Sequence, residues 1–419
     1  MSIRINPEIL VWARQTAGFD VDDAARKLGF KDSSKSTASE KLELMEAGEK
    51  QPTRAQISKF ADAYKRPLLT FYLSEPPRTG ERGQDFRQTP EARGRRDNAM
   101  LDALLRDVKA RQESVRELLL DEDGFRPHGF VGSTNRKASV LETVNSIAKQ
   151  INFDNTDVSL RSGDADSLFR RLRAAVESVG IFVMVLGNLG NYRTEIGSSV
   201  FRGFAISDEI APFIVINASD AKPARSFTLM HELAHVWLGQ TGVSGDISLK
   251  TPTSEHAKVE RFCNDVAGEF LLPDAHFKRT APAFMPDDLE AAKACIDLVA
   301  SRWSVSEPMV ALRFHRRGEL SAGAYETLRA QYHARWQAKL QRDKDKRPPD
   351  APGPNGHIMK QFNVGTALVD VVHRAVRGNT LTHSKAGALL GSKPGAVEPF
   401  LRQFEDKRRS FRSSGKVSR

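Results

Sequence analysis

Residues 225–239 read RSFTLMHELAHVWLG, and this stretch decides how the rest of the chain is interpreted. It contains His231, Glu232 and His235 in the pattern HExxH. In an α-helix, positions i and i+4 lie on one face, one turn apart, so both imidazoles project together and can bind one metal ion. Glu232 lies beside that face, badly angled to be a ligand but able to accept a proton from a metal-bound water. The apolar flanks predict a buried helix, the dry setting that strengthens a metal's field.

A catalytic zinc ion takes three protein ligands and leaves a fourth position open. No HxxGxxH extension follows His235, which excludes the metzincin arrangement. The helix expected over 258–271 offers Glu260 and Glu269, which lie half a helical rotation apart, so only one of them can face the metal. We expect Glu260 to be the third ligand, with Glu269 and His256 as the alternatives.

The sequence around this helix predicts an α+β fold. Three short runs of β-branched and aromatic residues predict strands of one small sheet, at 180–187, 202–206 and 211–217. The last run, APFIVIN, precedes the HELAH helix and is a candidate for the substrate-binding edge. Apolar residues at helical spacing predict helices over 99–120, 138–151, 166–179, 224–238, 258–271, 287–303, 307–317 and 322–340.

Changes in composition divide the chain into six segments. An all-α unit is expected over 1–78, with helices at 7–16, 21–28, 37–47, 51–64 and 68–73. The other segments are a linker with a long amphipathic helix (79–136), the central mixed domain (137–280), a helical extension (281–340), a linker (341–358) and a basic helical module (359–419).

Charge and cysteine content limit the classes of protein. Apolar residues make up 40% of the chain and charged residues 28%, which excludes a wholly disordered polypeptide. The net charge of +10 comes from residues 303–419, which contain 22 Lys and Arg but only 10 Asp and Glu. That basic end either binds a polyanion such as DNA or keeps a helical appendage soluble. Cys263 and Cys295 do not make a disulfide framework and are interpreted as small buried hydrophobes.

No stretch approaches the roughly 18 uninterrupted apolar residues of a membrane-spanning helix. The N-terminal residues also lack the apolar core of a signal peptide. We therefore expect a cytoplasmic protein without membrane contact.

The motif HELAH is followed by ERFCNDVAGEFLLP and preceded by a strand of the form P-x-I-x-x-N. This combination resembles the ImmA/IrrE-type zinc metallopeptidases, whose pattern is HExxH and then ExxAN-x-FA-x-E-x-L-x-P. The resemblance implies a zincin-like, gluzincin-like endopeptidase domain with one Zn²⁺ per chain. It places the ligands on His231, His235 and Glu260 and the general base on Glu232.

The chain departs from the family pattern in two places. Cys263 stands where alanine is usual, and Val266 where phenylalanine is usual. Both are interpreted as apolar replacements that do not touch the chemistry. Tyr192 and His256 are candidates to stabilise the oxyanion, although each is also readily explained as a surface residue.

The family resemblance also implies a function. Members cleave a regulatory protein, often a repressor or an antitoxin, and so switch on stress, mobile-element or toxin–antitoxin responses. The alternative is a DNA-binding transcriptional regulator or antitoxin whose peptidase domain is a sensor or is inactive.

The N-terminal segment resembles the XRE-type helix-turn-helix domain that is fused to long family members. Val21–Leu28 would be its first helix and Thr37–Ala47 its recognition helix. The latter carries three glutamates and one lysine, so base-reading side chains are few. The candidates for DNA contact are phosphate-binding lysines: Lys31, Lys35 and Lys41. The alternative is a partner-binding or dimerising domain, and the C-terminal module is interpreted as a packing subdomain or regulatory lid.

Overall fold

The computed structural model describes residues 4–34, 36–77, 95–157, 164–190, 194–244, 254–280, 283–345 and 356–414. Lys35 and Tyr192 lie outside these residues, as do the predicted linker residues 78–94 and 346–355. The chain divides into two compact units. The first comprises Met1–Lys109 and Asn188–Ile196, and the second Ala110–Gly187 and Gly197–Arg419.

The first unit begins with a small helical domain. Its elements are α1 (Pro7–Thr16), α2 (Val21–Leu28), α3 (Ala38–Glu46), α4 (Arg54–Tyr64) and the 3₁₀ helix η1 (Leu68–Tyr72). Capping boxes at Thr37 and Thr53 start α3 and α4, since each hydroxyl accepts from the backbone N–H three residues on. The fully buried rings of Phe60, Tyr64 and Phe71 pack its core. The five predicted helices are confirmed, the last as a 3₁₀ helix.

The second unit is built on a mixed four-stranded sheet in the order β1-β3-β2-β4. Its strands are β1 (Phe182–Leu186), β2 (Gly203–Ile206), β3 (Phe213–Asn217) and β4 (Gly242–Ser244). β1 is parallel to β3, whereas β2 is antiparallel to both β3 and β4.

The three predicted strands are confirmed, and β4 is an addition that the sequence does not predict. The expectation that APFIVIN forms the substrate-binding edge is wrong. Its strand β3 is interior because both β1 and β2 pair with it. β4 lies at the edge instead.

Helices make up most of the rest of this mostly helical α+β structure. Up to the basic module they are α5 (Arg95–Leu120), α6 (Val140–Gln150), α7 (Ala165–Ser178), α8 (Lys222–Trp237), α9 (Glu255–Leu271), α10 (Asp274–Thr280), α11 (Leu289–Trp303), α12 (Glu307–Arg316) and α13 (Ala322–Asp345). α5 contains the boundary between the two units. α10 is not predicted, and α13 continues to Asp345, inside the segment 341–358 that the sequence predicts as a linker.

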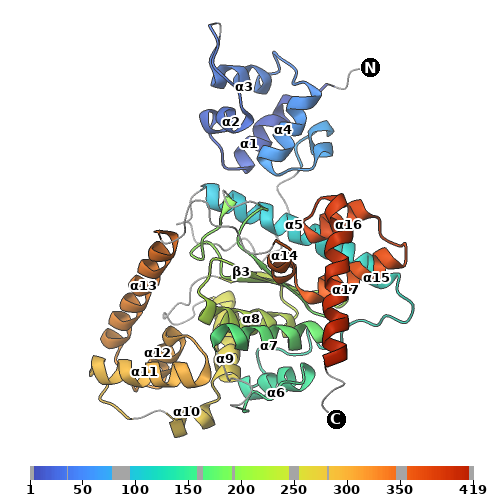
Figure 1. Ribbon diagram of the computed structural model, residues 1–419. Helices are drawn as coiled ribbons and strands as arrows, with labels where there is room; N and C mark the ends of the chain where they lie inside the picture. The colour runs from blue at the N-terminus through green and yellow to red at the C-terminus, as the bar shows by residue number, and fades with distance from the viewer. Residues whose placement is uncertain are drawn as a thin grey trace. The chain divides into compact units, whose positions relative to one another are not determined.

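The central helix α8 carries the HELAH motif and is buried almost all round. It packs against β2 and β3 and against α7 and α9 (Figure 1). A helix that is buried on every face belongs to a core, and here the buried residues include the two histidines and Glu232. Trp237 near its end is fully buried, stacks on Phe130 with ring centroids 4.8 Å apart, and donates to the Ser146 hydroxyl. This packing fixes the helix, and with it the direction of the two imidazoles.

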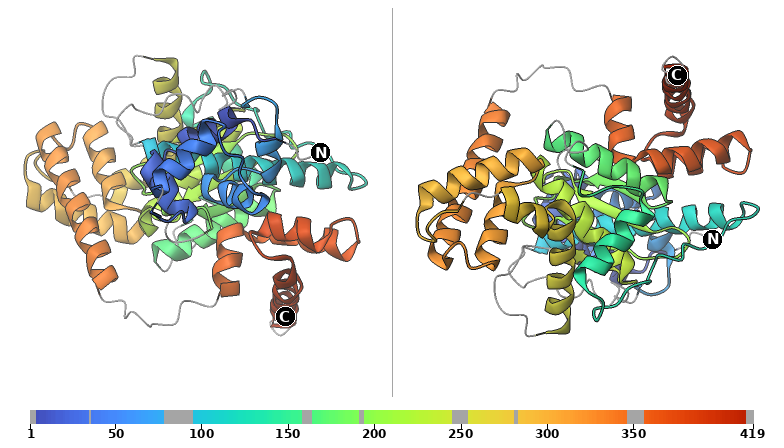
Figure 2. Two further views of the ribbon diagram at one scale, coloured as in Figure 1. Left: turned by 90° about the horizontal axis from the view of Figure 1, so that it is seen from above. Right: turned by 90° about the horizontal axis from the view of Figure 1, so that it is seen from below.

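The C-terminal helices belong to the same compact unit as the sheet. They are α14 (Gly356–Val364), α15 (Thr366–Arg377), α16 (His383–Leu390) and α17 (Val397–Ser414). α14 packs against β1, and α15 against β1 and α7. Figures 1 and 2 place these helices and α11–α13 on opposite sides of the sheet. Within the described residues, no helix combines the length and the hydropathy needed to cross a membrane.

Candidate metal centre

Three side chains from two helices meet beside the sheet. His231 and His235 lie one turn apart on α8, and their Nε2 atoms are 3.1 Å from each other. Glu260, on α9, brings one carboxylate oxygen to 3.3 Å from Nε2 of His231 and the other to 3.2 Å from Nε2 of His235. Among the described residues, these three form a group of possible metal ligands whose atoms all lie within 4.8 Å of one another.

The spacing of these atoms fits a zinc ion. Ligands 2.0–2.1 Å from a tetrahedral centre lie roughly 3.3 Å from one another. The separation of 3.1 Å between the two nitrogens, and those of 3.3 and 3.2 Å from each nitrogen to its nearer Glu260 oxygen, are close to that value. Two imidazoles and one carboxylate are also a usual donor set for catalytic zinc, with the fourth position left for water or substrate.

One imidazole has a hydrogen-bond partner on its outer nitrogen. Nδ1 of His231 is 3.0 Å from the Asn264 side-chain oxygen, which fixes the ring and leaves its Nε2 for a metal. The Cys263 thiol interacts with His235. The sequence predicts Cys263 as a buried residue that does not touch the chemistry. Its burial is confirmed, and its thiol helps to raise the pKa of His235.

The ionisation of the group follows from its burial and close contacts. Burial pulls the pKa of His231 down, but the Glu260 carboxylate outweighs it and the pKa rises. Burial also lowers the pKa of His235, but Cys263 and, to a smaller extent, Glu260 outweigh it and raise this pKa to about 10. Burial alone would raise the pKa of Glu260, but its hydrogen bonds with the imidazoles lower it. A metal ion at this place would displace those protons, since it binds neutral imidazole and ionised carboxylate.

Glu232 lies next to His231 in the chain and is not one of the three grouped ligands. Its side chain is fully buried, on the part of α8 that packs under β2. Its negative charge acts on the His231 imidazole and raises the pKa of that ring. The carboxylate is therefore close to the prospective metal position without being part of the ligand group.

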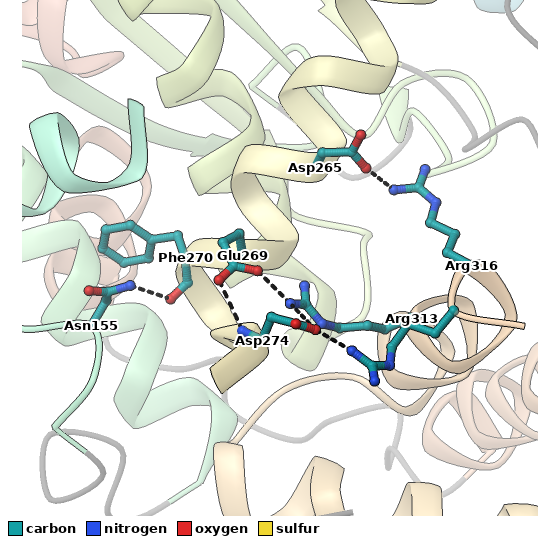
Figure 3. Close-up of polar contacts among 8 residues, drawn as sticks. Asn155, Asp265, Glu269, Phe270, Asp274, Arg313 and Arg316 are labelled. Atoms are coloured by element: carbon teal, nitrogen blue, oxygen red, sulfur yellow. Dashed lines mark hydrogen bonds and ion pairs between the residues drawn. The ribbon is translucent and has the colours of Figure 1, made fainter. Parts of the chain in front are cut away.

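Glu269, one alternative for the third ligand, serves a different purpose. Its carboxylate accepts the backbone N–H of Asp274 at 2.9 Å and pairs with Arg313 at 2.5 Å (Figure 3). On the same helix Asp265 pairs with Arg316. These contacts turn Glu269 toward α12. His256, the other alternative, is not part of the ligand group among the described residues.

A cavity of about 290 Å³ lies between α9 and α12. Phe227 and Asn264 contribute to its wall, and both also contact His231. Because Asn264 lies on the Nδ1 side of that ring, the cavity adjoins the outer side of the ligand cluster.

The lysines predicted for DNA contact lie in the first unit. Lys41, on α3, donates its ammonium to the backbone carbonyl of Lys31 at 2.6 Å. Both lie around the turn between α2 and α3. Lys35, the third candidate, is outside the described residues.

The fold and the ligand cluster together define a metallopeptidase domain of the HExxH class with a glutamate third ligand. A comparison with protein families agrees, because residues 191–315 match Peptidase_M78, the IrrE N-terminal-like domain. The chain therefore contains an IrrE N-terminal-like peptidase domain, and the resemblance seen in the sequence is confirmed for this span. The match covers α8, α9 and most of α12. Comparisons with curated proteins and with solved structures found no match.

Proposed function

We propose that this protein is a zinc-dependent endopeptidase that cleaves a regulatory protein, a repressor or an antitoxin, in a stress, mobile-element or toxin–antitoxin response. The observation that carries the proposal is the convergence of His231, His235 and Glu260 at zinc-ligand spacing. Glu232 beside them supplies the acid–base group that a structural metal site does not need. Because gene regulators act in the cytoplasm, we place the activity there.

The residues divide the work of peptide hydrolysis. His231, His235 and Glu260 would hold the ion, and Asn264 would orient His231. When bound, a zinc ion polarises the scissile carbonyl and makes a nearby water acidic. Glu232 takes the proton of the attacking water and returns it to the leaving amine. Its complete burial strengthens the electrostatic interactions through which it acts.

We further propose that the N-terminal helices form an XRE-type helix-turn-helix domain that brings the peptidase to its regulatory partner or to DNA. Two features support this domain: α2 and α3 pack together, and Lys31 and Lys41 meet at their turn. The three glutamates of the α3 segment disfavour base reading, so phosphate contacts would dominate binding to DNA.

The substrate class can be tested with the regulator encoded beside the gene. Purified zinc-loaded protein should cut this regulator at one or a few sites, and a zinc chelator should abolish the cleavage. An excess of an unrelated folded protein should stay intact in the same tube. A regulator that survives alongside active cleavage of other peptides would contradict the proposed substrate class while leaving the peptidase activity in place.

A further inference from the structure

Gly203, the first residue of β2, lies directly against the proposed general base. A Cβ atom at this position would be 2.7 Å from Oε1 and 3.0 Å from Cγ of Glu232. It would also be 2.6 Å from the methyl carbon of Thr228, one turn earlier on α8. Packed protein interiors do not tolerate such distances without movement. The side chains of Thr228 and Glu232 therefore occupy the space that a side chain at position 203 would need.

Backbone conformation does not explain this glycine. Its φ is outside the left-handed region that glycine adopts more easily than other residues. Glycine weakens a strand. One recognised reason for finding it there is that another group approaches the backbone closely. Here the approaching groups are the side chains of Glu232 and Thr228.

The surroundings decide which group would move if a side chain were added. β2 is paired on both sides at this residue, with Ile216 of β3 and Ser244 of β4. Thr228 is held by its hydroxyl, which donates to the Ala224 carbonyl at 3.3 Å. The Glu232 carboxylate lies at the end of a flexible side chain. It is therefore the group that yields most easily.

We propose that Gly203 is a positioning residue for Glu232: the bare backbone of β2 limits where the carboxylate can lie and so holds it at the reacting water. This inference rests on the proposed peptidase function. It assigns a role in the reaction to Gly203, which belongs to no recognised sequence motif. A general base acts only within hydrogen-bonding reach of its proton, and a misplacement of about 1 Å can cost roughly 100-fold in rate.

The geometric part of the inference can be tested without any substrate, in a cycle of thermal unfolding measurements. Gly203→Ala should lower the Tm by several degrees, because the added methyl group overpacks the site. In a Glu232→Ala background, which removes Cγ and Oε1, the same change should cost clearly less. The Thr228 contact is present in both backgrounds and cancels. The control is Gly129→Ala, where nothing lies within 4 Å of the new atom.

Equal Tm losses in the two backgrounds would overturn the inference. So would failure of both the single and the double variant to fold, because contacts other than the one with Glu232 would then exclude the Cβ. If Gly203→Ala fails to fold but the double variant folds, the clash with Glu232 is established directly.

The effect of Gly203 on catalysis can be measured with a peptide substrate. The substrate is the most rapidly cleaved member of a peptide library prepared from a digested bacterial proteome. Gly203→Ala should keep one zinc per chain and a nearly unchanged KM, while kcat falls roughly 100-fold. In a Glu232→Gln background it should cause no further loss. Full activity of Gly203→Ala beside an inactive Glu232→Gln would overturn the inference but leave the proposed function standing. If the wild type itself cleaves nothing, the proposed function fails, and the unfolding cycle still decides the geometry.

Discussion

At the scale of single residues, the ligand group depends on which carboxylate of α9 reaches the imidazoles. Glu260 contacts both rings, whereas Glu269 is held by Arg313 and by the backbone of Asp274. We therefore expect Glu260→Gln to lose most of its bound zinc and Glu269→Gln to keep it. Elemental analysis of the purified variants measures this difference. Equal zinc contents in the two variants would assign the third ligand elsewhere.

Asn264 has a supporting role that binding measurements can isolate. Its side-chain oxygen accepts from Nδ1 of His231 at 3.0 Å and so fixes the ring orientation. Loss of such an outer partner typically costs 10–100-fold in metal affinity. We expect this range for Asn264→Ala in a competition titration with a zinc chelator. An unchanged affinity would mean that packing alone orients the ring.

The sequence predicts some of these roles and not others, for a physical reason. His231, Glu232 and His235 lie on one helix, so the period of 3.6 residues is enough to relate them. The same period places Glu260 and Glu269 on opposite sides of α9. The contact of Cys263 with His235 and the approach of Gly203 to Glu232 join different elements. Such contacts depend on how those elements pack, which no local pattern contains.

At the scale of secondary-structure elements, a buried ion pair joins the C-terminal helices to the sheet. Arg173 and Glu177, both on α7, pair at 3.2 Å. Arg173 also donates to the carbonyls of Phe362 on α14 and Val183 on β1. Glu177 accepts the backbone N–H of Thr366 at the start of α15. One pair thus holds the α14–α15 junction against β1.

Removing one partner of this pair should loosen the C-terminal helices. Arg173→Met leaves the Glu177 charge buried without its guanidinium, a change that typically costs about 3–5 kcal/mol. Thermal unfolding should show the loss, and limited proteolysis should release the C-terminal helices sooner. The control is Arg170→Met, an exposed arginine on the same helix. If both variants behave alike, the pair does not hold the junction.

Long periodic elements are the ones that the sequence predicts best. Helix α1 and helix α2 agree with their predicted residues, and α8 and α9 differ only at their ends. β4 has three residues, too few for an alternating pattern, and it is missed. The interior place of β3 is missed too, because strand order depends on pairing between distant segments.

At the scale of the whole molecule, the N-terminal unit offers a test of partner choice. If it binds DNA, phosphate contacts must dominate, and affinity for a random-sequence duplex should fall steeply with salt. Replacing both Lys31 and Lys41 by alanine in the full chain should weaken binding and flatten the salt dependence. Salt-independent binding, or no binding at low salt, would favour a protein-interaction role for this unit.

The basic C-terminal end can be examined in the same assay. Residues 303–419 carry the positive excess of the chain, and α14 and α15 pack on the sheet and α7. Composition revealed the charge but could not reveal where the helices pack, because that depends on contacts such as the Arg173–Glu177 pair. If the end contributes to DNA binding, removing residues 378–419 should weaken it further.

The central claim is that the HELAH motif on α8 forms the active site of a peptidase. The substitution Glu232→Gln tests this claim most directly. The substitution preserves size and helix propensity but cannot accept a proton. Both proteins should hold one zinc per chain, and cleavage of the proteome-derived peptide library should fall at least ~100-fold in the variant. Mass spectrometry of the new peptide ends measures both rates side by side. Equal cleavage by the two zinc-loaded proteins would contradict the account and reduce the HELAH helix to a structural metal site.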